Sequence, residues 1–240
     1  MLQRGGQEVP HAGKGDDVRA RLVAAAARVL EREGPAAVQA RRLTRDIGTS
    51  TTAVYHYFGG MPELLRAVAD DGFAHLEHRL GGVDPSGDPV TDICVLALVY
   101  RRAARENPHL YDLMFGLAAP GGHRPEPTAT AGDTEGPAHD AYAHLVAAVR
   151  RGIDQRRLRE VDAVHAAAQL WSMLHGFVTL ELAGHFDHID DPIAHVLLPL
   201  GTHLLIGLGD DPDRALNSGA AAMSTMSAMS PSSRALRSPR

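Results

Sequence analysis

The sequence TSTTAVYHYFGGMPELL, residues 49–65, decides how this chain is interpreted. It begins with four small hydroxyl residues, which are typical of the start of a helix. Two tyrosines, a histidine and a phenylalanine follow, and a double glycine then precedes a second apolar stretch. Phe, Trp and Tyr make up only 5% of the 240 residues, so this concentration of rings asks for an explanation.

The flanking sequence predicts that this stretch is the second half of a helix-turn-helix. A short helix fits residues 40–47 and ends at Gly48, and another fits residues 51–58 after a turn of about three residues. In that motif the second helix lies in the major groove of DNA, and its first residues reach the base edges. A generic amphipathic helix with a Ser/Thr cap is the alternative.

Two sets of side chains in this helix have different expected tasks. Val54 and Phe58 would anchor it beside Leu43 and Ile47. The others would cap the helix, approach a phosphate or contact a base: Thr49, Ser50, Thr51, Thr52, Tyr55 and His56.

Charge is distributed unevenly along the chain. The net charge is −5, and residues 1–60 hold nine Lys or Arg and six Asp or Glu, a net of +3 that leaves −8 for the remainder. A basic front suggests that only this part meets a polyanion, although chance is an equal explanation of so small an excess.

The remaining sequence predicts further helices, and no strand alternation is evident. A helix begins at Val18, with Asp16 or Asp17 as cap. Prolines that follow a small or capping residue mark several later starts, and Pro199 should kink or break the last helix. The expected ranges are 18–34, 61–80, 89–105, 108–117, 137–157, 161–183 and 192–208. Residues 118–136 predict a long loop, and residues 217–240 predict a disordered tail that is solvated or clings to DNA.

Residues 18–65 resemble the N-terminal domain of TetR-family transcriptional repressors. The resemblance rests on "LVAAAARVLEREG" (22–34), "LTRDIGTS" (43–50) and "TTAVYHYFGG" (51–60). It implies DNA contacts at Arg41 or Arg42, as well as at the recognition helix. The chain has Met61 where the family usually has a phosphate-binding lysine, and Gly60 where it usually has a hydroxyl cap, which predicts weaker DNA binding.

The C-terminal half resembles the TetR module named for its Trp-His-Gly signature, through "LWSMLHGF" (170–177) and "ENPHLYDLMFG" (106–116). Together the resemblances imply an all-α fold, with a three-helix helix-turn-helix domain followed by a helical ligand-binding and dimerisation bundle. The expected divisions are a disordered tail at 1–15, the DNA-binding domain at 16–60, the C-terminal domain at 61–209 and a disordered tail at 210–240.

The predicted function is a homodimeric, ligand-responsive repressor that binds duplex DNA at a palindromic operator and is released by a small apolar effector. The dimer would form through residues 162–183 and 192–208. On the first helix Leu170, Leu174 and Phe177 add a second apolar face. On the second, leucines recur at 197, 200, 204 and 208.

The effector pocket is expected inside the C-terminal bundle, where rings cluster and the loop 118–136 could control entry. The candidate ligand-binding residues, which could equally be core, are Tyr100, Tyr111, Met114, Phe115, Trp171 and His175. Charged helix faces suggest a neutral or weakly acidic ligand.

The alternative is a helical enzyme or metal protein that uses the histidine-rich C-terminal half. His75 with His78, and His185 with His188, have metal-ligand spacing, but no third ligand is near them and solvated histidine is the simpler interpretation. No catalytic motif is present, so we expect no enzyme activity, metal or cofactor.

The single cysteine, Cys94, excludes an intrachain disulfide and fits a reducing compartment. No apolar stretch approaches the roughly 20 residues that span a bilayer. These features predict a cytoplasmic protein without a membrane partner.

Overall fold

The computed structural model describes residues 14–118 and 135–229, and every regular element within these ranges is helical. The all-α prediction is therefore confirmed. In chain order the elements are α1 (Lys14–Glu33), η1 (Pro35–Ala37), α2 (Ala40–Asp46), α3 (Thr52–Phe58), α4 (Met61–Gly81), α5 (Pro89–Glu106), α6 (Pro108–Met114), α7 (Pro137–Asp154), α8 (Ala163–Leu182), η3 (Ile193–Leu197), α9 (Leu198–Gly207) and α10 (Pro212–Met229).

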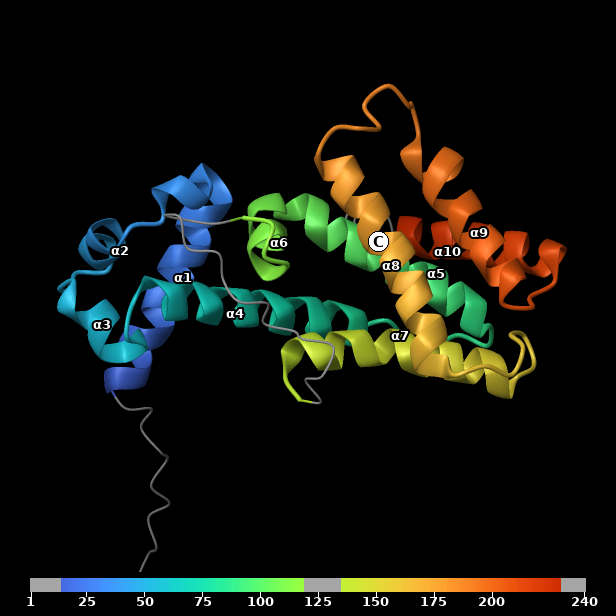
Figure 1. Cartoon of the computed structure of the whole chain (residues 1–240), viewed down its shortest axis with the longest axis horizontal. Coiled ribbons are helices and arrows are strands. Elements are labelled where there is room, and N and C mark those ends of the chain that lie inside the picture. Colours follow the sequence, from blue (N-terminus) through green and yellow to red (C-terminus); the bar gives the residue numbers. More distant parts are fainter. Residues whose placement is uncertain (1–13, 119–134, 230–240) are drawn as a thin grey trace, which may run out of the picture.

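Helices α1, α2 and α3 form a small lobe, which we call the head (Figure 1). Val54 and Phe58 are buried on one side of α3, and Leu43 of α2 belongs to the same core. Gly48 in the turn between these helices has φ +70°, a left-handed conformation that glycine adopts readily. The predicted helix-turn-helix is present, with Thr51 as the N-cap of α3.

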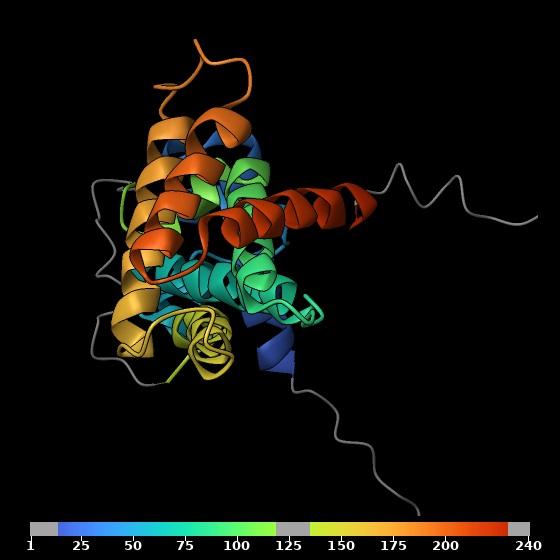
Figure 2. The ribbon, with the colours of Figure 1, turned by 90° about the vertical axis from the view of Figure 1, so that its right-hand side faces the viewer.

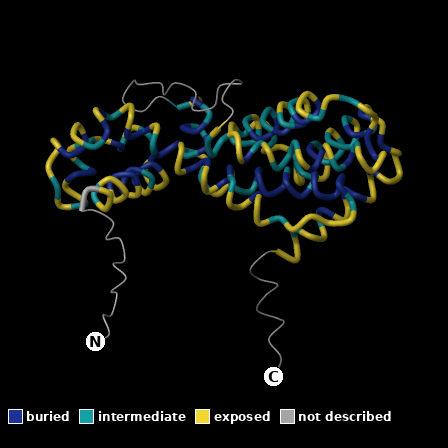
Figure 3. The backbone as a smooth tube through the Cα atoms, turned by 90° about the horizontal axis from the view of Figure 1, so that it is seen from below, coloured by how far each residue is buried: buried dark blue, intermediate teal, exposed yellow. Residues whose placement is uncertain are grey.

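The long helix α4 connects the head with the larger lobe, which we call the bundle (Figure 1). It contacts α1 and α3 in the head, and α5 and α7 in the bundle. Figure 3 shows buried residues in the middle of both lobes and exposed residues at their rims. Because α4 is shared, its first turns pack with the head, although the expected division placed residue 61 in the C-terminal domain.

Three helices of the bundle region begin at the capping residues that the sequence predicts. The Asp88 carboxylate accepts from the Val90 N–H at 3.1 Å at the start of α5, and the Asn107 side-chain oxygen Oδ1 accepts from the Leu110 N–H at 3.1 Å at the start of α6. Asp162 caps α8 through the His165 N–H at 2.9 Å. These bonds satisfy donors that a helix leaves free at its first turn.

The last predicted helix, residues 192–208, is interrupted as expected near Pro199. A π-helical turn, η3, precedes α9, and Pro199 lies in the first turn of α9. Proline has no N–H to donate, so the hydrogen-bond pattern changes where it enters the helix.

The prediction of a disordered tail after residue 209 is wrong for the described part of the chain, because residues 212–229 form α10. This helix crosses α5 and α9, and its end projects from the bundle (Figure 2). Its buried face consists of small residues, which allow close approach: Ala215, Ser218, Gly219 and Ala222. At the other end, α1 begins at Lys14, inside the expected tail 1–15. Residues 1–13 and 230–240 lie outside the described ranges.

A buried ionic network holds α10 to α5 and to the turn after α7. The Arg157 guanidinium donates to both Asp210 oxygens at 2.8 Å and also to Asp88. The Ser218 hydroxyl of α10 donates to Asp88 at 2.5 Å. Burial acts to raise the pKa of Asp88, but the hydrogen bonds from Ser218 and Thr91 and the charge of Arg157 outweigh it and lower that pKa.

Candidate DNA-binding head and ligand cavity

The side of α3 that faces away from the core carries exposed polar rings. The Tyr55 side chain is 64% exposed, and His56 is exposed beside it. Tyr57 is half-buried, and its ring meets His56 edge-on with centroids 4.8 Å apart. Val54 and Phe58 pack this helix into the core of the head. Tyr55 and His56 therefore project to solvent from a helix whose position is fixed by packing.

The hydroxyl residues before α3 lie where the sequence predicts, but the side chain of Thr51, at the N-cap position, does not bond to the helix. Helix α3 starts instead with backbone bonds from Ala53 N–H to the Ser50 carbonyl and from Val54 N–H to the Thr51 carbonyl. Ser50, Thr51 and Thr52 are exposed and Thr49 is half-buried. The threonine side chain at the N-cap is therefore not committed to its own helix.

The two arginines that begin α2 have different environments. The Arg42 guanidinium donates to both oxygens of Glu33 in α1, one bond being 2.6 Å long. Those bonds, together with the charge of Arg42, lower the pKa of Glu33 although desolvation acts to raise it. Arg41 is exposed, and its guanidinium has no ion pair within the described residues. Of the two, Arg41 is the one available to a phosphate.

A third arginine, Arg45, is a candidate that the sequence interpretation missed. Its side chain is 77% exposed at the end of α2, and its only ion pair in the described ranges is a 3.7 Å contact with neighbouring Asp46. The basic residue next to the predicted turn was the available signal. Arg21, in contrast, donates to the Ile47 carbonyl at the end of α2, and Arg19 stacks over the Phe58 ring at 5.1 Å.

A large apolar cavity lies in the bundle, with a volume of about 1220 Å³. Its walls come from α4, α5, α7, α8 and α9, together with Phe115 after α6. Leucine, alanine and aromatic side chains form most of this surface, as is usual for a site that binds small apolar molecules. The helices α4 and α9 were not expected to contribute.

Three of the six predicted ligand-binding residues line the cavity, and three do not. Tyr100, Phe115 and Trp171 are wall residues. Tyr111, Met114 and His175 are not, so a role for them in ligand binding stays a prediction. Met114 packs instead against α4, where a Cβ added to Gly72 would lie 2.9 Å from its sulfur. The expected control of entry by residues 118–136 falls mostly outside the described ranges.

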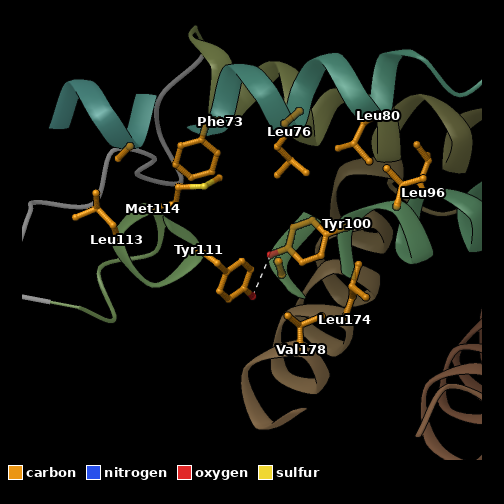
Figure 4. Packing of buried hydrophobic residues seen from close by; sticks show 14 of the residues in the cluster. Phe73, Leu76, Leu80, Leu96, Tyr100, Tyr111, Leu113, Met114, Leu174 and Val178 are labelled. Atoms are coloured by element: carbon orange, nitrogen blue, oxygen red, sulfur yellow. Dashed lines mark hydrogen bonds between the residues drawn. The ribbon is translucent and has the colours of Figure 1, made fainter. Parts of the chain in front are cut away.

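Tyr111 and His175 lie directly behind the wall and are bonded to it. The Tyr111 hydroxyl is 2.7 Å from His175 Nδ1, and the Tyr100 hydroxyl is 3.2 Å from the Tyr111 oxygen and 3.1 Å from Nδ1. Figure 4 shows the two tyrosine hydroxyls pointing toward one another. We call Tyr100, Tyr111 and His175 the polar triad.

Burial keeps the polar triad uncharged. It raises the pKa of Tyr100 well above its usual range, although a hydrogen bond from Trp171 acts in the opposite direction. Burial also raises the pKa of Tyr111 and lowers that of His175. The triad therefore consists of two phenols and a neutral imidazole near pH 7.

Helix α6 joins the triad to the head. Tyr111 faces His175 of α8, while Leu110 and Met114 lie against Gly72 of α4. At the start of α6, His109 is 3.4 Å from the position that a Cβ on Gly34 would take, at the end of α1. One short helix therefore touches the wall behind the cavity, the connecting helix and the head.

Within the described ranges, no group of three or more His, Cys, Asp or Glu residues is arranged to hold a metal ion. His75, from the first histidine pair with metal-ligand spacing, donates from Nδ1 to the Asp71 carbonyl of its own helix at 2.8 Å. No described helix is both long and apolar enough to cross a bilayer.

A supported recognition helix after a short helix and a tight turn, joined by α4 to a hollow helical bundle, defines the class of helix-turn-helix DNA-binding regulators. Comparison with known proteins specifies the family. The profile described as "Bacterial regulatory proteins, tetR family" matches residues 22–68, and the one described as "Tetracyclin repressor-like, C-terminal domain" matches residues 95–200.

An HTH-type transcriptional regulator of Mycobacterium tuberculosis, Rv0681, is 32% identical over 175 residues, which cover 72% of this chain and 73% of that one. The chain belongs to the TetR family of bacterial transcriptional regulators. The Trp-His-Gly type of its C-terminal module stays a prediction.

Two solved structures have a similar fold. A protein from Rhodococcus sp. RHA1 is 25% identical, with a TM-score of 0.65, over 85% of this chain and all of that one. RolR in complex with its ligand resorcinol is 19% identical, with a TM-score of 0.61, over 87% of this chain and 96% of that one.

Proposed function

We propose that this chain is a homodimeric repressor that binds a palindromic operator through α3 and is released when a small apolar molecule occupies the bundle cavity. The proposed DNA-binding unit is residues 16–60 with the first turns of α4, and the proposed ligand-binding and dimerisation unit is the rest of the described chain.

The observation that carries the proposal is the contrast between the two sides of α3. One side is locked into the head by Val54 and Phe58, while Tyr55 on the other is 64% exposed without a burial role. Arg41 and Arg45 are exposed on the adjacent helix. Exposed aromatic and basic side chains on a rigid helix pair suit contacts with bases and phosphates.

The proposed DNA contacts keep the predicted set, with one change of role. Tyr55, His56 and the hydroxyls of residues 49–52 would meet the DNA directly. Arg41 and Arg45 would bind phosphates, whereas Arg42 would position α2 through Glu33. Met61 begins α4 without a cationic group, so fewer phosphates are neutralised than a lysine there would allow.

Dimerisation through α8 and α9 is supported by exposed apolar residues, although not by those first considered. Leu170, Leu174 and Phe177 are buried within the chain, at 4%, 6% and 3% exposure, so the inference of a partner from that face fails. Leu180 on α8 and Leu200 on α9 are instead 45% and 43% exposed. A dimer that buries them would place two α3 helices for successive major grooves.

Small residues strengthen the case for a helix-packing surface on these two helices. A Cβ added to Gly176 of α8 or to Gly207 of α9 would meet no atom within 4 Å. The two helices lie side by side in the bundle (Figure 2). Their shared outer face is therefore open to close approach by another helix.

Release by a ligand is proposed from the contacts of α6. An effector that contacts Tyr100 acts on a side chain bonded to Tyr111, and α6 touches the head at Gly34. The ligand can shift the head only by the difference between its affinities for the two arrangements. RolR, of the same fold, has been crystallised with the ligand resorcinol.

Selection of bound fragments from random duplex DNA tests the proposal. The full chain should enrich a palindrome whose half-sites are about one helical turn apart. Tyr55→Ala should enrich nothing while keeping the circular dichroism of the wild type, and Tyr142→Phe, in the bundle, should enrich the same palindrome. Enrichment of no sequence by the wild type, or of the same sequence by Tyr55→Ala, would overturn it.

A further inference from the structure

The charged and polar groups of the cavity are separated by depth. Four charged or titratable residues of the wall are exposed to solvent: Asp70, Glu135, His139 and Arg150. The buried or half-buried polar wall residues include Tyr100, Trp171, Cys94 and His144. His144 Nε2 lies 3.3 Å from the Glu77 carboxylate. Tyr142 is also in the wall, but its hydroxyl already donates to the Val164 carbonyl at 2.9 Å.

The polar triad behind Tyr100 has a defined direction of hydrogen bonding. A phenol is a stronger acid than a neutral imidazole N–H, so His175 Nδ1 accepts and the 2.7 Å contact is a bond donated by Tyr111. The Tyr111 oxygen is then the acceptor for the Tyr100 hydroxyl at 3.2 Å. The Tyr100 hydroxyl is also 3.1 Å from Nδ1, so its hydrogen is donated away from the cavity, either to Tyr111 or to His175.

Because Tyr100 is the member of the polar triad that lines the cavity, this direction leaves an acceptor at the cavity end. A phenolic oxygen accepts two hydrogen bonds, and Trp171 supplies one to Tyr100. No further donor to this oxygen occurs within the described residues. Because Tyr100 donates onward, the cooperative polarisation of the chain makes its oxygen a better acceptor.

We propose that the cavity recognises an uncharged molecule with an apolar body and one hydroxyl group, which donates its hydrogen to the Tyr100 oxygen. This inference rests on the proposed function, since it specifies the effector of the same cavity. A hydroxyl extends the existing chain without breaking a bond. A ketone or ether must instead take the Tyr100 hydrogen from Tyr111.

Charge selection follows from the same wall. A carboxylate at Tyr100 would meet no buried cation in the wall, and an unpaired buried charge is strongly unfavourable. The nearest candidate on α5, Arg101, is committed to Glu181 of α8, with Nε 2.8 Å from the carboxylate. Cys94 stays a thiol, because burial raises its pKa to about 12. The deep end therefore favours a neutral ligand.

Displacement of a neutral dye, N-phenyl-1-naphthylamine, tests the inference with two probes of equal size, 1-decanol and methyl nonyl ether. The alcohol donates a hydrogen bond and the ether does not. The affinity for the alcohol divided by the affinity for the ether should fall about fivefold in Tyr100→Phe, which corresponds to one lost hydrogen bond. Because the ratio is compared between proteins, the different hydration of the probes cancels.

Tyr142→Phe is the matched control, since it removes a hydroxyl from the same wall that is bonded elsewhere, and it should leave the ratio unchanged. Tyr111→Phe keeps Tyr100 but removes the phenol between it and His175, which leaves Tyr100 only its 3.1 Å contact with Nδ1. The ratio should therefore fall about twofold. This variant also decides the matter if Tyr100→Phe does not fold.

An unchanged ratio in Tyr100→Phe, or in Tyr111→Phe where Tyr100→Phe is unfolded, overturns the hydroxyl assignment while dye binding still supports the effector cavity. Failure of the dye and both probes to bind overturns the proposed cavity, and the inference with it. The selection against charge is refuted if decanoate displaces the dye at the same concentration as decanol and if Arg150→Gln has the same affinity for decanoate as the wild type. The second condition shows that decanoate is not held by Arg150 at the exposed part of the wall.

Discussion

Replacing Arg157 should reveal how strongly α10 is bound to the bundle. The Arg157 and Asp210 side chains are 4% and 1% exposed, and they are joined by two 2.8 Å bonds. Arg157→Met keeps the length of the side chain but leaves the Asp210 carboxylate buried without its cation. Removing one partner of such a pair costs about 3–5 kcal/mol of the free energy of unfolding.

We expect the lower end of this range, about 3 kcal/mol, for two structural reasons. Asp210 still accepts from the Asp211 N–H at 2.9 Å, and Asp88 still accepts from Ser218 and Thr91. Urea unfolding followed by Trp171 fluorescence measures the change, at one protein concentration because the proposed dimerisation would add to stability.

Two further variants identify the cause. Arg157→Met with Asp210→Asn removes both charges and should recover at least about 1 kcal/mol relative to Arg157→Met alone. Arg159→Met, two residues on and exposed, should change the free energy of unfolding by less than about 0.5 kcal/mol. A loss below about 1 kcal/mol for Arg157→Met, or a double variant less stable than the single one, would refute this reasoning.

Three other predictions concern the bundle. Leu200→Glu should give monomers in sedimentation velocity, because it places an unpaired charge in the proposed interface, whereas Leu216→Glu on α10 should stay dimeric; a dimeric Leu200→Glu would place the interface elsewhere. Burial lowers the pKa of His175 below its ordinary value of 6.5, so the folded state resists protonation and the free energy of unfolding should fall as the pH drops below about 6.5. The free energy of unfolding of His175→Asn should fall less over this pH range. An identical pH profile would contradict the lowered pKa of His175. Cys94, with its pKa raised to about 12, should react with iodoacetamide at pH 8 far more slowly in the folded chain than in urea, and equal rates would disprove its burial.

The head and most helix starts were predictable because their causes are local. Asp88, Asn107 and Asp162 each cap the helix that follows them, and a capping side chain with its neighbour can be recognised in sequence. The helix-turn-helix was recognisable for the same reason, since Gly48 and the hydroxyl residues lie next to one another.

The wrong predictions have a common cause. They concern features of the structure that depend on residues distant in the sequence. The composition of residues 217–240 predicted a disordered tail, yet residues 212–229 form α10. Ser218 of that helix finds a partner in Arg157, some sixty residues earlier. The same limit applies to the cavity. Tyr111, Met114 and His175 were grouped by composition, but only packing decides that they lie behind the wall rather than in it.

The central claim, that this chain binds duplex DNA through α2 and α3, is tested most directly by the salt dependence of its affinity for the selected operator. The logarithm of the binding constant should fall steeply with the logarithm of salt concentration. Arg41→Ala and Arg45→Ala should each reduce that slope by about one unit, and Arg150→Ala, exposed on α7, should not change it. A slope near zero for the wild type, or slopes unaltered in both head variants, would contradict the account.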